Sequence, residues 1–366
     1  MEGFNNENQC ILALCRQQDF QREYITTAFK QRLHLPYVLG QLLFHRVGGI
    51  AYHVLAECGL LSGLNREFRN PLKMVCEASR AKTKSFLQAE NELALLFAQA
   101  DFPHAFLKGA LLSRVYPLGL RTSNDFDVLI HQQDTQKITD LLTESGFTQG
   151  FLRNDVFTPA TRSDILYARM NKGETVPFVK RIGLPHMPWL EVDVNFSLDF
   201  KAEQNNDAVQ KILERAENTI VTESGALPTL SKVDFLIHLC AHLYKEATTY
   251  HWVNVGRDLS LYKFCDILLF IDLYFSESYE DLANELAEAI ETLSQQKPCA
   301  YTFYYARELF GLKNSALDDL ITRIMPADTD FLRQVYHPAE QKTYCFDMDY
   351  TDYLFHQNRI ACLREV

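Results

Sequence analysis

The sequence has no C-x-x-C pair, no long uncharged apolar run and only two tryptophans. Its nine cysteines are scattered and odd in number, so we expect reduced thiols in a cytosolic protein rather than a disulfide framework. No segment reaches the length of an uncharged membrane span, and the first residues lack the basic and apolar regions of a signal peptide. We therefore expect a cytoplasmic protein that has no membrane partner.

Positive charge is also scarce. The chain has 36 Lys and Arg against 47 Asp and Glu, a net charge of −11. This balance argues against a long nucleic-acid acceptor, because phosphates attract a basic surface. One local basic run is formed by Arg162, Arg169, Lys172, Lys180 and Arg181. Such a run is either a solvated loop or a site for a triphosphate or an acidic acceptor.

Hydrophobic periodicity divides the 366 residues into regions. Apolar residues recur at helical spacing in 1–100 and again in 201–366, whereas 101–200 contains short alternating strands and turns. We predict an α+β fold in which a mixed-sheet core, 101–200, is flanked by N-terminal and C-terminal helical regions.

Two local signals support the predicted helices. Asp134 can cap a helix that reaches about Ser145. Ser231 and Asp234 have the spacing of a capping box at the start of a C-terminal helix.

A D-x-D pattern opens the most apolar strand of the predicted core. Asp125 and Asp127 point to one face of the strand, while Phe126, Val128 and Ile130 point to the other. Two adjacent carboxylates repel each other unless a cation lies between them. A divalent metal, Mg²⁺ or Mn²⁺, is the cation that suits this pair, and it indicates phosphate chemistry.

A second alternating segment, residues 190–196, offers a third carboxylate. Glu191, Asp193 and Asn195 share its polar face. Taken alone, this segment is typical of a half-buried strand with a solvated face. If it lies beside the D-x-D strand, one acidic residue completes a metal-binding triad, and the pattern does not choose between Glu191 and Asp193.

These motifs resemble the nucleotidyltransferase superfamily that shares a polymerase-beta-like core. More narrowly, residues 105–200 resemble an uncharacterised bacterial nucleotidyltransferase-like family with three motifs: an L-K-G turn, an R-x-x-x-D-x-D strand and a later acidic-x-His-aromatic strand. The matching residues are Leu107, Lys108, Gly109, Tyr116, Pro117, Arg121, Asp125, Asp127, Asp193, Val194, Asn195 and Phe196. Asn195 stands where the family has His, and Ala110 replaces a second small residue of the superfamily turn. The resemblance selects Asp193 rather than Glu191.

The resemblance implies transfer of a nucleoside monophosphate from an NTP, for example ATP, with release of pyrophosphate. Asp125, Asp127 and Asp193 are then the catalytic, metal-binding carboxylates. Lys108 and Arg121 are candidate phosphate-binding cations, and Gly109 would let backbone amides approach phosphate. Their structural alternatives are an exposed turn lysine and an arginine that pairs with an aspartate. A small-molecule, peptide or protein acceptor fits the acidic chain better than nucleic acid.

The helix that follows Ser231 carries a second set of polar residues. His238, His242 and Lys245 lie off its apolar stripe. Zinc is not expected, because no Glu follows the first histidine as in H-E-x-x-H. We predict that His242 and Lys245 bind the nucleotide phosphates; the alternative is polar positions that flank a packed stripe.

Three other functions fit parts of the pattern. A metal-dependent glycosyltransferase also uses D-x-D, but its apolar strand usually precedes the motif, whereas here it follows. A catalytically inactive module of the same fold would bind a nucleotide or a partner protein without turnover. A toxin-like enzyme that modifies tRNA is the third, and the acidic chain counts against it.

Overall fold

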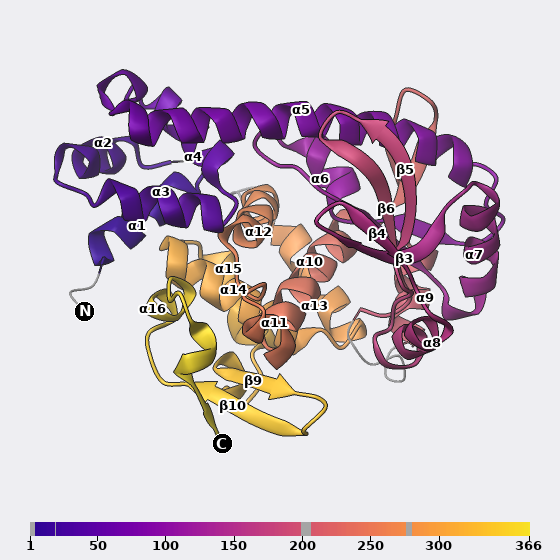
Figure 1. Cartoon of the computed structure of the whole chain (residues 1–366). Helices are drawn as coiled ribbons and strands as arrows, with labels where there is room; N and C mark the ends of the chain where they lie inside the picture. The colour runs from indigo at the N-terminus through magenta and orange to yellow at the C-terminus, as the bar shows by residue number, and fades with distance from the viewer. Residues whose placement is uncertain (1–3, 19, 199–205, 276–279) are drawn as a thin grey trace. The chain divides into compact units, whose positions relative to one another are not determined.

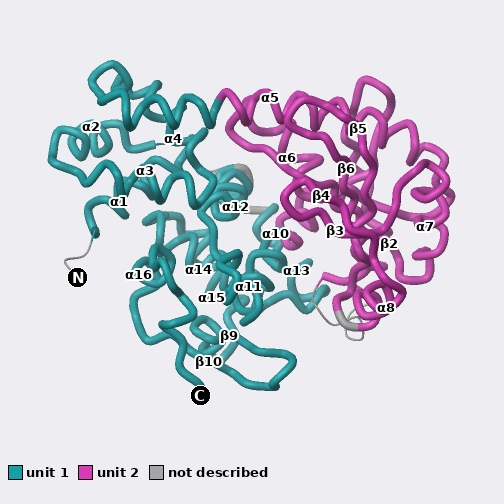
Figure 2. The backbone as a smooth tube through the Cα atoms, viewed as in Figure 1, with its two compact units in different colours: residues 1–76, 239–366 teal, residues 77–238 magenta. Residues whose placement is uncertain are grey.

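The computed structural model describes residues 4–18, 20–198, 206–275 and 280–366. The chain divides into two compact units (Figure 2): residues 1–76 with 239–366 form unit 1, and residues 77–238 form unit 2. The predicted boundaries after residues 100 and 200 therefore both fall within the sequence range of unit 2. Residues 1–76 and 239–366, which come from the two predicted helical regions, form a single unit.

Unit 1 is mainly helical (Figure 1). Its helices are α1 (Asn5–Leu14), α2 (Arg22–Lys30), α3 (Leu35–Phe44), α4 (Gly48–Glu57), α11 (Tyr250–Asn254), α12 (Leu261–Tyr274), α13 (Glu280–Thr292), α14 (Gln296–Phe310), α15 (Ser315–Ile324) and α16 (Tyr350–Leu354), with short 3-10 turns at Leu61–Gly63, Asp330–Leu332 and Arg359–Cys362. A small antiparallel sheet in the order β11-β10-β9 adds strands that the sequence reading did not predict: β9 (Gln334–His337), β10 (Lys342–Phe346) and β11 (Leu363–Glu365).

Unit 2 is built on a mixed sheet with the order β4-β3-β5-β6-β2-β1-β8-β7. The strands are β1 (His104–Phe106), β2 (Phe126–Ile130), β3 (Thr148–Arg153), β4 (Val156–Pro159), β5 (Phe178–Leu184), β6 (Met187–Asn195), β7 (Asn218–Val221) and β8 (Ala226–Thr229). Helices α6 (Gly109–Val115), α7 (Thr135–Glu144), α8 (Arg162–Asn171) and α9 (Asn206–Glu214) join them. The predicted α+β class with a mixed sheet and helical flanks is confirmed.

Two expectations about the sheet region need correction. Strands β7 and β8 extend the sheet with residues 218–229, where only helices were expected, and β8 pairs parallel with β1. Helix α8 lies in the region 101–200 at a place where short strands and turns were expected and no helix was predicted. Its N-terminus carries a capping box between Thr161 and Asp164, a local signal that the sequence reading overlooked.

The predicted helix starts also differ in detail. Helix α7 begins after Asp134 as expected, but that carboxylate makes no capping hydrogen bond and instead lies 3.4 Å from Lys137. The predicted N-cap at Ser231 is confirmed, because the Asp234 amide donates to the Ser231 hydroxyl over 3.1 Å and the hydroxyl donates to the Asp234 carboxylate over 2.8 Å.

Two long helices belong to both units. Helix α5 (Arg66–Phe97) runs from unit 1 into unit 2, and α10 (Lys232–Ala247) returns from unit 2 to unit 1 (Figure 2). The chain therefore passes between the units inside regular helix at both crossings. Among the residues that the structure describes, no helix is long and apolar enough to cross a membrane.

The core of unit 2 explains why β2 and β6 have one apolar face. Phe86 of α5 stacks on Phe126 of β2, with ring centroids 4.0 Å apart and an interplanar angle of 8°. Val128 and Val192 are fully buried in the same apolar cluster, together with Ile138 of α7. Burial of these side chains fixes the strand register, because a slip of one residue would bring the aspartates into the core.

Candidate functional site

The site begins with the pairing of β2 and β6. These strands are adjacent and parallel, and the register sets Asp127 directly opposite Asp193. The condition set in the sequence analysis, that the two alternating segments lie side by side, is met. Asp125 comes one residue before β2, and Glu191 comes two residues before Asp193 on the same face of β6. Four carboxylates therefore gather on the face of the sheet that is opposite the apolar core.

Lys108 is tied to this acidic face. Its Nζ lies 2.7 Å from Oδ1 of Asp127, and the two side chains are only 17% and 7% exposed. The amide of Leu107 also donates to the backbone oxygen of Asp127 over 2.9 Å. The backbone of Lys108 has φ = +39°, in a region that a side chain with Cβ seldom adopts. The contact to Asp127 accounts for a lysine at this strained position, and it does not fit the alternative of an exposed turn lysine.

The absence of a side chain at position 109 has a steric reason. A Cβ at this position would lie 2.4 Å from the Ser123 hydroxyl oxygen and 2.5 Å from the Ser123 Cβ. That hydroxyl donates to Oδ1 of Asp125 over 3.1 Å. The missing side chain at Gly109 thus makes room for the residue that holds Asp125. This contact adds a second role to the one that the sequence reading gave to the glycine.

The pKa values of the carboxyl groups reflect their crowding. Burial and the charge of Asp127 raise the pKa of Asp125, while Lys108 and Arg121 act in the opposite direction. Burial and the charges of Asp125 and Asp127 raise the pKa of Glu191 to about 7. The same causes raise the pKa of Asp193 well above its usual range. Ionisation of all four carboxyl groups would leave more negative charge than Lys108 and Arg121 neutralise.

The carboxylates of this face offer oxygen ligands for a divalent cation. As the described side chains stand, His, Cys, Asp and Glu do not form a group of three or more that is arranged around a metal position. Two carboxylates have other partners, Lys108 on Asp127 and Ser123 on Asp125. Oδ1 of Asp193, however, is buried and has no hydrogen-bond donor among the described residues. An unmatched buried oxygen among like charges fits a cation, and oxygen donors are what Mg²⁺ prefers.

Arg121 and Asn195 complete the residues that the motifs selected in this unit. The Arg121 guanidinium donates to the backbone oxygen of Thr122, and its charge lowers the pKa of Asp125. The Asn195 side chain donates to the backbone oxygen of Asp193 over 3.3 Å. Both residues thus lie among the carboxylates, while a nucleotide-binding role for Arg121 stays a prediction.

One member of the basic run, Lys180, is not on the acidic face. Lys180 pairs in register with Leu190, and residues paired across antiparallel strands share a face. Its ammonium lies 5.6 Å from the ring centroid of Phe147, a core residue. Lys180 therefore belongs to the side of the sheet that carries the apolar core.

The sequence analysis did not identify Glu174, an acidic residue next to the site. Glu174 forms an isolated bridge with Asn195, and its charge helps to raise the pKa of Asp193. The amide of Thr175 donates to Val194 over 2.9 Å, so the segment that leaves α8 is bound to the end of β6. No local pattern marks Glu174, because it precedes β5 and lies outside the alternating stretches.

The sequence analysis also did not predict a buried ion pair between α5 and α6. Glu90 of α5 is fully buried and accepts from Arg114 of α6 over 2.5 Å. Burial raises the pKa of Glu90 to about 7, although Arg114 acts in the opposite direction. This pair fastens the helix that follows Gly109 to α5, and its two residues are too far apart in sequence to signal a contact.

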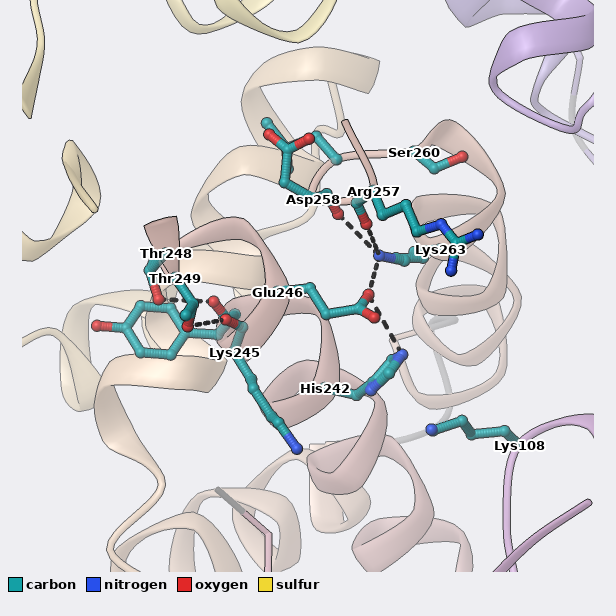
Figure 3. Close-up of polar contacts among 12 residues, drawn as sticks. Lys108, His242, Lys245, Glu246, Thr248, Thr249, Arg257, Asp258, Ser260 and Lys263 are labelled. Carbon is teal, nitrogen blue, oxygen red and sulfur yellow. Dashed lines mark hydrogen bonds and ion pairs between the residues drawn. The ribbon is translucent and has the colours of Figure 1, made fainter. Parts of the chain in front are cut away.

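His242 and Lys245 lie on α10, in the part that belongs to unit 1. Figure 3 shows His242 and Lys263 converging on the Glu246 carboxylate, while the Lys245 side chain extends in another direction. The His242 Nε2 is 3.4 Å from Glu246, and Lys263 also donates to the backbone oxygen of Asp258 over 2.7 Å. The prediction that His242 and Lys245 bind nucleotide phosphates stays a prediction.

Comparison with known proteins adds to this geometry. The sequence profile of a family described as uncharacterised nucleotidyltransferase matches residues 36–311. A crystal structure of an antigenic nucleotidyltransferase-like protein from Paracoccidioides brasiliensis resembles 64% of this chain and 96% of its own, with 20% sequence identity and a TM-score of 0.33. No curated protein matches.

The matched profile and the D-x-D strand beside an acidic parallel strand define the class of protein, a nucleotidyltransferase fold. Because the match covers about three quarters of the sequence, the chain belongs to the uncharacterised nucleotidyltransferase family.

Proposed function

We propose that the protein is a metal-dependent nucleotidyltransferase. It transfers a nucleoside monophosphate from an NTP such as ATP to a hydroxylated acceptor and releases pyrophosphate. The observation that carries the proposal is the pairing of Asp127 with Asp193 across β2 and β6, with Asp125 next to them. This arrangement brings together oxygen donors from two strands around a region of excess negative charge.

Asp125, Asp127 and Asp193 are the residues that would hold Mg²⁺ or Mn²⁺. When bound, the metal would neutralise phosphate charge and activate the acceptor hydroxyl. The buried Oδ1 of Asp193, which has no donor among the described residues, supports its place in this set.

Lys108 has a second role in the proposal. In the present structure it neutralises Asp127 at 2.7 Å. A cation at that carboxylate would compete with the ammonium, which could then turn to a phosphate oxygen of the NTP. Arg121, whose charge already acts on Asp125, would add a second positive group near the triphosphate. These residues position and neutralise, which is the main contribution of a protein to phosphoryl transfer.

The decisive experiment measures NTP-dependent pyrophosphate release with Mg²⁺, together with mass spectrometry of candidate acceptors after incubation with each NTP. Asp127→Asn keeps the size of the side chain and removes its charge. We expect the variant to retain its circular dichroism spectrum and to lose at least about 100-fold in turnover. Asp140→Asn is the matched control, because Asp140 is exposed on α7 in the same unit.

Three outcomes would count against the proposal. Unchanged turnover and unchanged calorimetric NTP binding in Asp127→Asn would rule out the carboxylate site. Metal-dependent NTP binding by the wild type without pyrophosphate release, over the whole acceptor panel, would favour the catalytically inactive binding module. Hydrolysis or transfer of a sugar from a nucleotide sugar would favour the D-x-D glycosyltransferase.

A further inference from the structure

Helix α8 of unit 2 exposes a concentration of large apolar side chains. Leu166 is 59% exposed, Tyr167 60% and Met170 67%. At 100° per residue these side chains span about 100° of one face of the helix. Single exposed apolar residues are ordinary on a protein surface, whereas three within five residues on one helix face indicate an interaction site.

Positive charge borders this face. Arg162 and Arg169 lie next to Leu166 on the helix surface, at spacings of four and three residues. The buried Nε of Arg169 has no acceptor among the residues that the structure describes. Lys172 follows directly after the helix, and the one acidic residue of α8, Asp164, is held by the Thr161 capping box. A basic, apolar face on a chain of net charge −11 matches an acidic, apolar partner.

The α8 face is also connected to the proposed site. Met170 precedes Glu174 by four residues, so their Cα atoms are at most about 15 Å apart. Glu174 bridges Asn195 and acts on the pKa of Asp193. An extended peptide of about five residues spans that distance. A polypeptide bound on α8 could therefore place a serine, threonine or tyrosine hydroxyl at the carboxylates.

We propose that the α8 face (Arg162, Leu166, Tyr167, Arg169 and Met170) is the docking surface for the acceptor, and that this acceptor is an acidic, apolar polypeptide. The inference rests on the proposed function, because it assigns the acceptor class of the same site. The reaction would join the α-phosphorus of the NTP to the acceptor hydroxyl oxygen. The bond from that phosphorus to the leaving pyrophosphate would break, and the hydroxyl proton would pass to solvent.

The test uses a fluorescent twelve-residue peptide of alternating Asp and Leu with one central Ser, and a counterpart with Lys in place of every Asp. Binding to the full-length protein is followed by fluorescence anisotropy without NTP. We expect the acidic peptide to bind and the basic one not to bind. Arg162→Glu combined with Arg169→Glu should weaken binding at least about tenfold, through lost attraction and added repulsion. Met170→Ser should weaken it about tenfold through lost apolar contact.

Two matched controls belong to the same assay. Met74 of α5 has the same 67% exposure as Met170, and Met74→Ser should leave binding unchanged. Arg153 is exposed on β3, and Arg153→Glu should also leave it unchanged. Asp127→Asn should bind the peptide as the wild type does, so that loss of catalysis and loss of docking are separate results.

Three outcomes would overturn the proposal. The first is equal binding of the two peptides, or no binding of either. The second is peptide binding that survives both α8 variants. The third is a wild type whose sedimentation shows a dimer that Met170→Ser dissociates, since the face would then be covered by a second copy of this chain.

Discussion

Two clusters of acidic groups, one in each unit, differ in how far their charge is neutralised. In unit 1, the fully buried Asp258 accepts two hydrogen bonds from Arg359, at 2.7 and 2.6 Å, and Glu246 is met by both Lys263 and His242. In unit 2, four carboxylates share one face of the sheet.

The acidic face has fewer counter-charges. Lys108 contacts Asp127, and the charge of Arg121 acts on Asp125. A matched cluster serves folding, because each desolvated charge has a partner. A cluster of carboxylates without enough cations lowers the stability of the fold. Such clusters are typical of functional sites, where the charge takes part in binding or catalysis.

The largest effect on stability should come from removing a carboxylate from the neutralised cluster of unit 1. Asp258→Ala leaves the Arg359 guanidinium buried without its carboxylate, and we expect the free energy of unfolding to fall by about 3–5 kcal/mol. Urea titration followed by circular dichroism measures this. The half-buried pair of Asp318 with Arg307, at 3.0 Å, provides the control. Asp318→Ala should cost less than about 1 kcal/mol, and equal costs for the two variants would contradict the comparison.

A smaller effect should come from the packing that holds the acidic face. Gly109→Ala brings a methyl group against Ser123, and we expect a loss of about 1–3 kcal/mol from overpacking. Adding Ser123→Gly should restore most of the lost free energy of unfolding. Gly40→Ala is the control, since nothing lies within 4 Å of that Cβ position. Failure of the double variant to recover would show that the contact with Ser123 is not the cause.

The pH dependence of stability tests the excess charge itself. The pKa of Glu191 is raised from 4.5 to about 7 in the folded protein. Its contribution to stability is therefore fully present below pH 4.5 and is lost as the pH rises through about 7. In EDTA, Glu191→Gln should gain on the order of 1 kcal/mol over the wild type between pH 5 and pH 8.

Glu90, whose pKa is also raised to about 7, is present in both the wild type and Glu191→Gln. Its titration therefore cancels when the stabilities of the two proteins are subtracted. Glu144→Gln, at an exposed position of α7, should show no pH-dependent difference. If Glu191→Gln and wild type differ by the same amount at both pH values, the carboxylates do not carry unmatched charge.

The smallest effect on stability is expected at Lys245. A half-buried lysine on α10 contributes little to folding, so Lys245→Ala should change the free energy of unfolding by less than about 0.5 kcal/mol. If the residue binds a phosphate, the same variant should raise the KM for NTP. Lys313→Ala, at an exposed position of unit 1, gives the baseline. Identical steady-state rates for Lys245→Ala and wild type would remove Lys245 from the nucleotide site.

Local patterns predicted a large part of unit 2. The alternation in β2 and β6 gave both strands and the face that each presents, because strand periodicity is a property of a few neighbouring residues. Helix α10 could be predicted from its capping box and its apolar stripe. The resemblance to a nucleotidyltransferase family joined these pieces into one site.

Long-range contacts were out of reach of those patterns. Thr229 of β8 donates to the backbone oxygen of Phe106 over 2.7 Å, across more than a hundred residues of sequence. Asp258 and Arg359 are similarly remote in the chain. Helix α8 escaped because three of its large apolar side chains face outward, so its apolar pattern does not describe a face packed on the core.

The two shared helices have a consequence for how the protein unfolds. The crossings after Cys76 and after His238 lie within α5 and α10, where each backbone amide is bonded to a carbonyl one turn earlier. If one unit unfolded, α5 and α10 would each lose the turns that lie in that unit. The part of each helix that remained in the folded unit would then end without its hydrogen-bond partners. The two units should therefore unfold in one cooperative transition, and a protease should find no exposed linker at which to separate them.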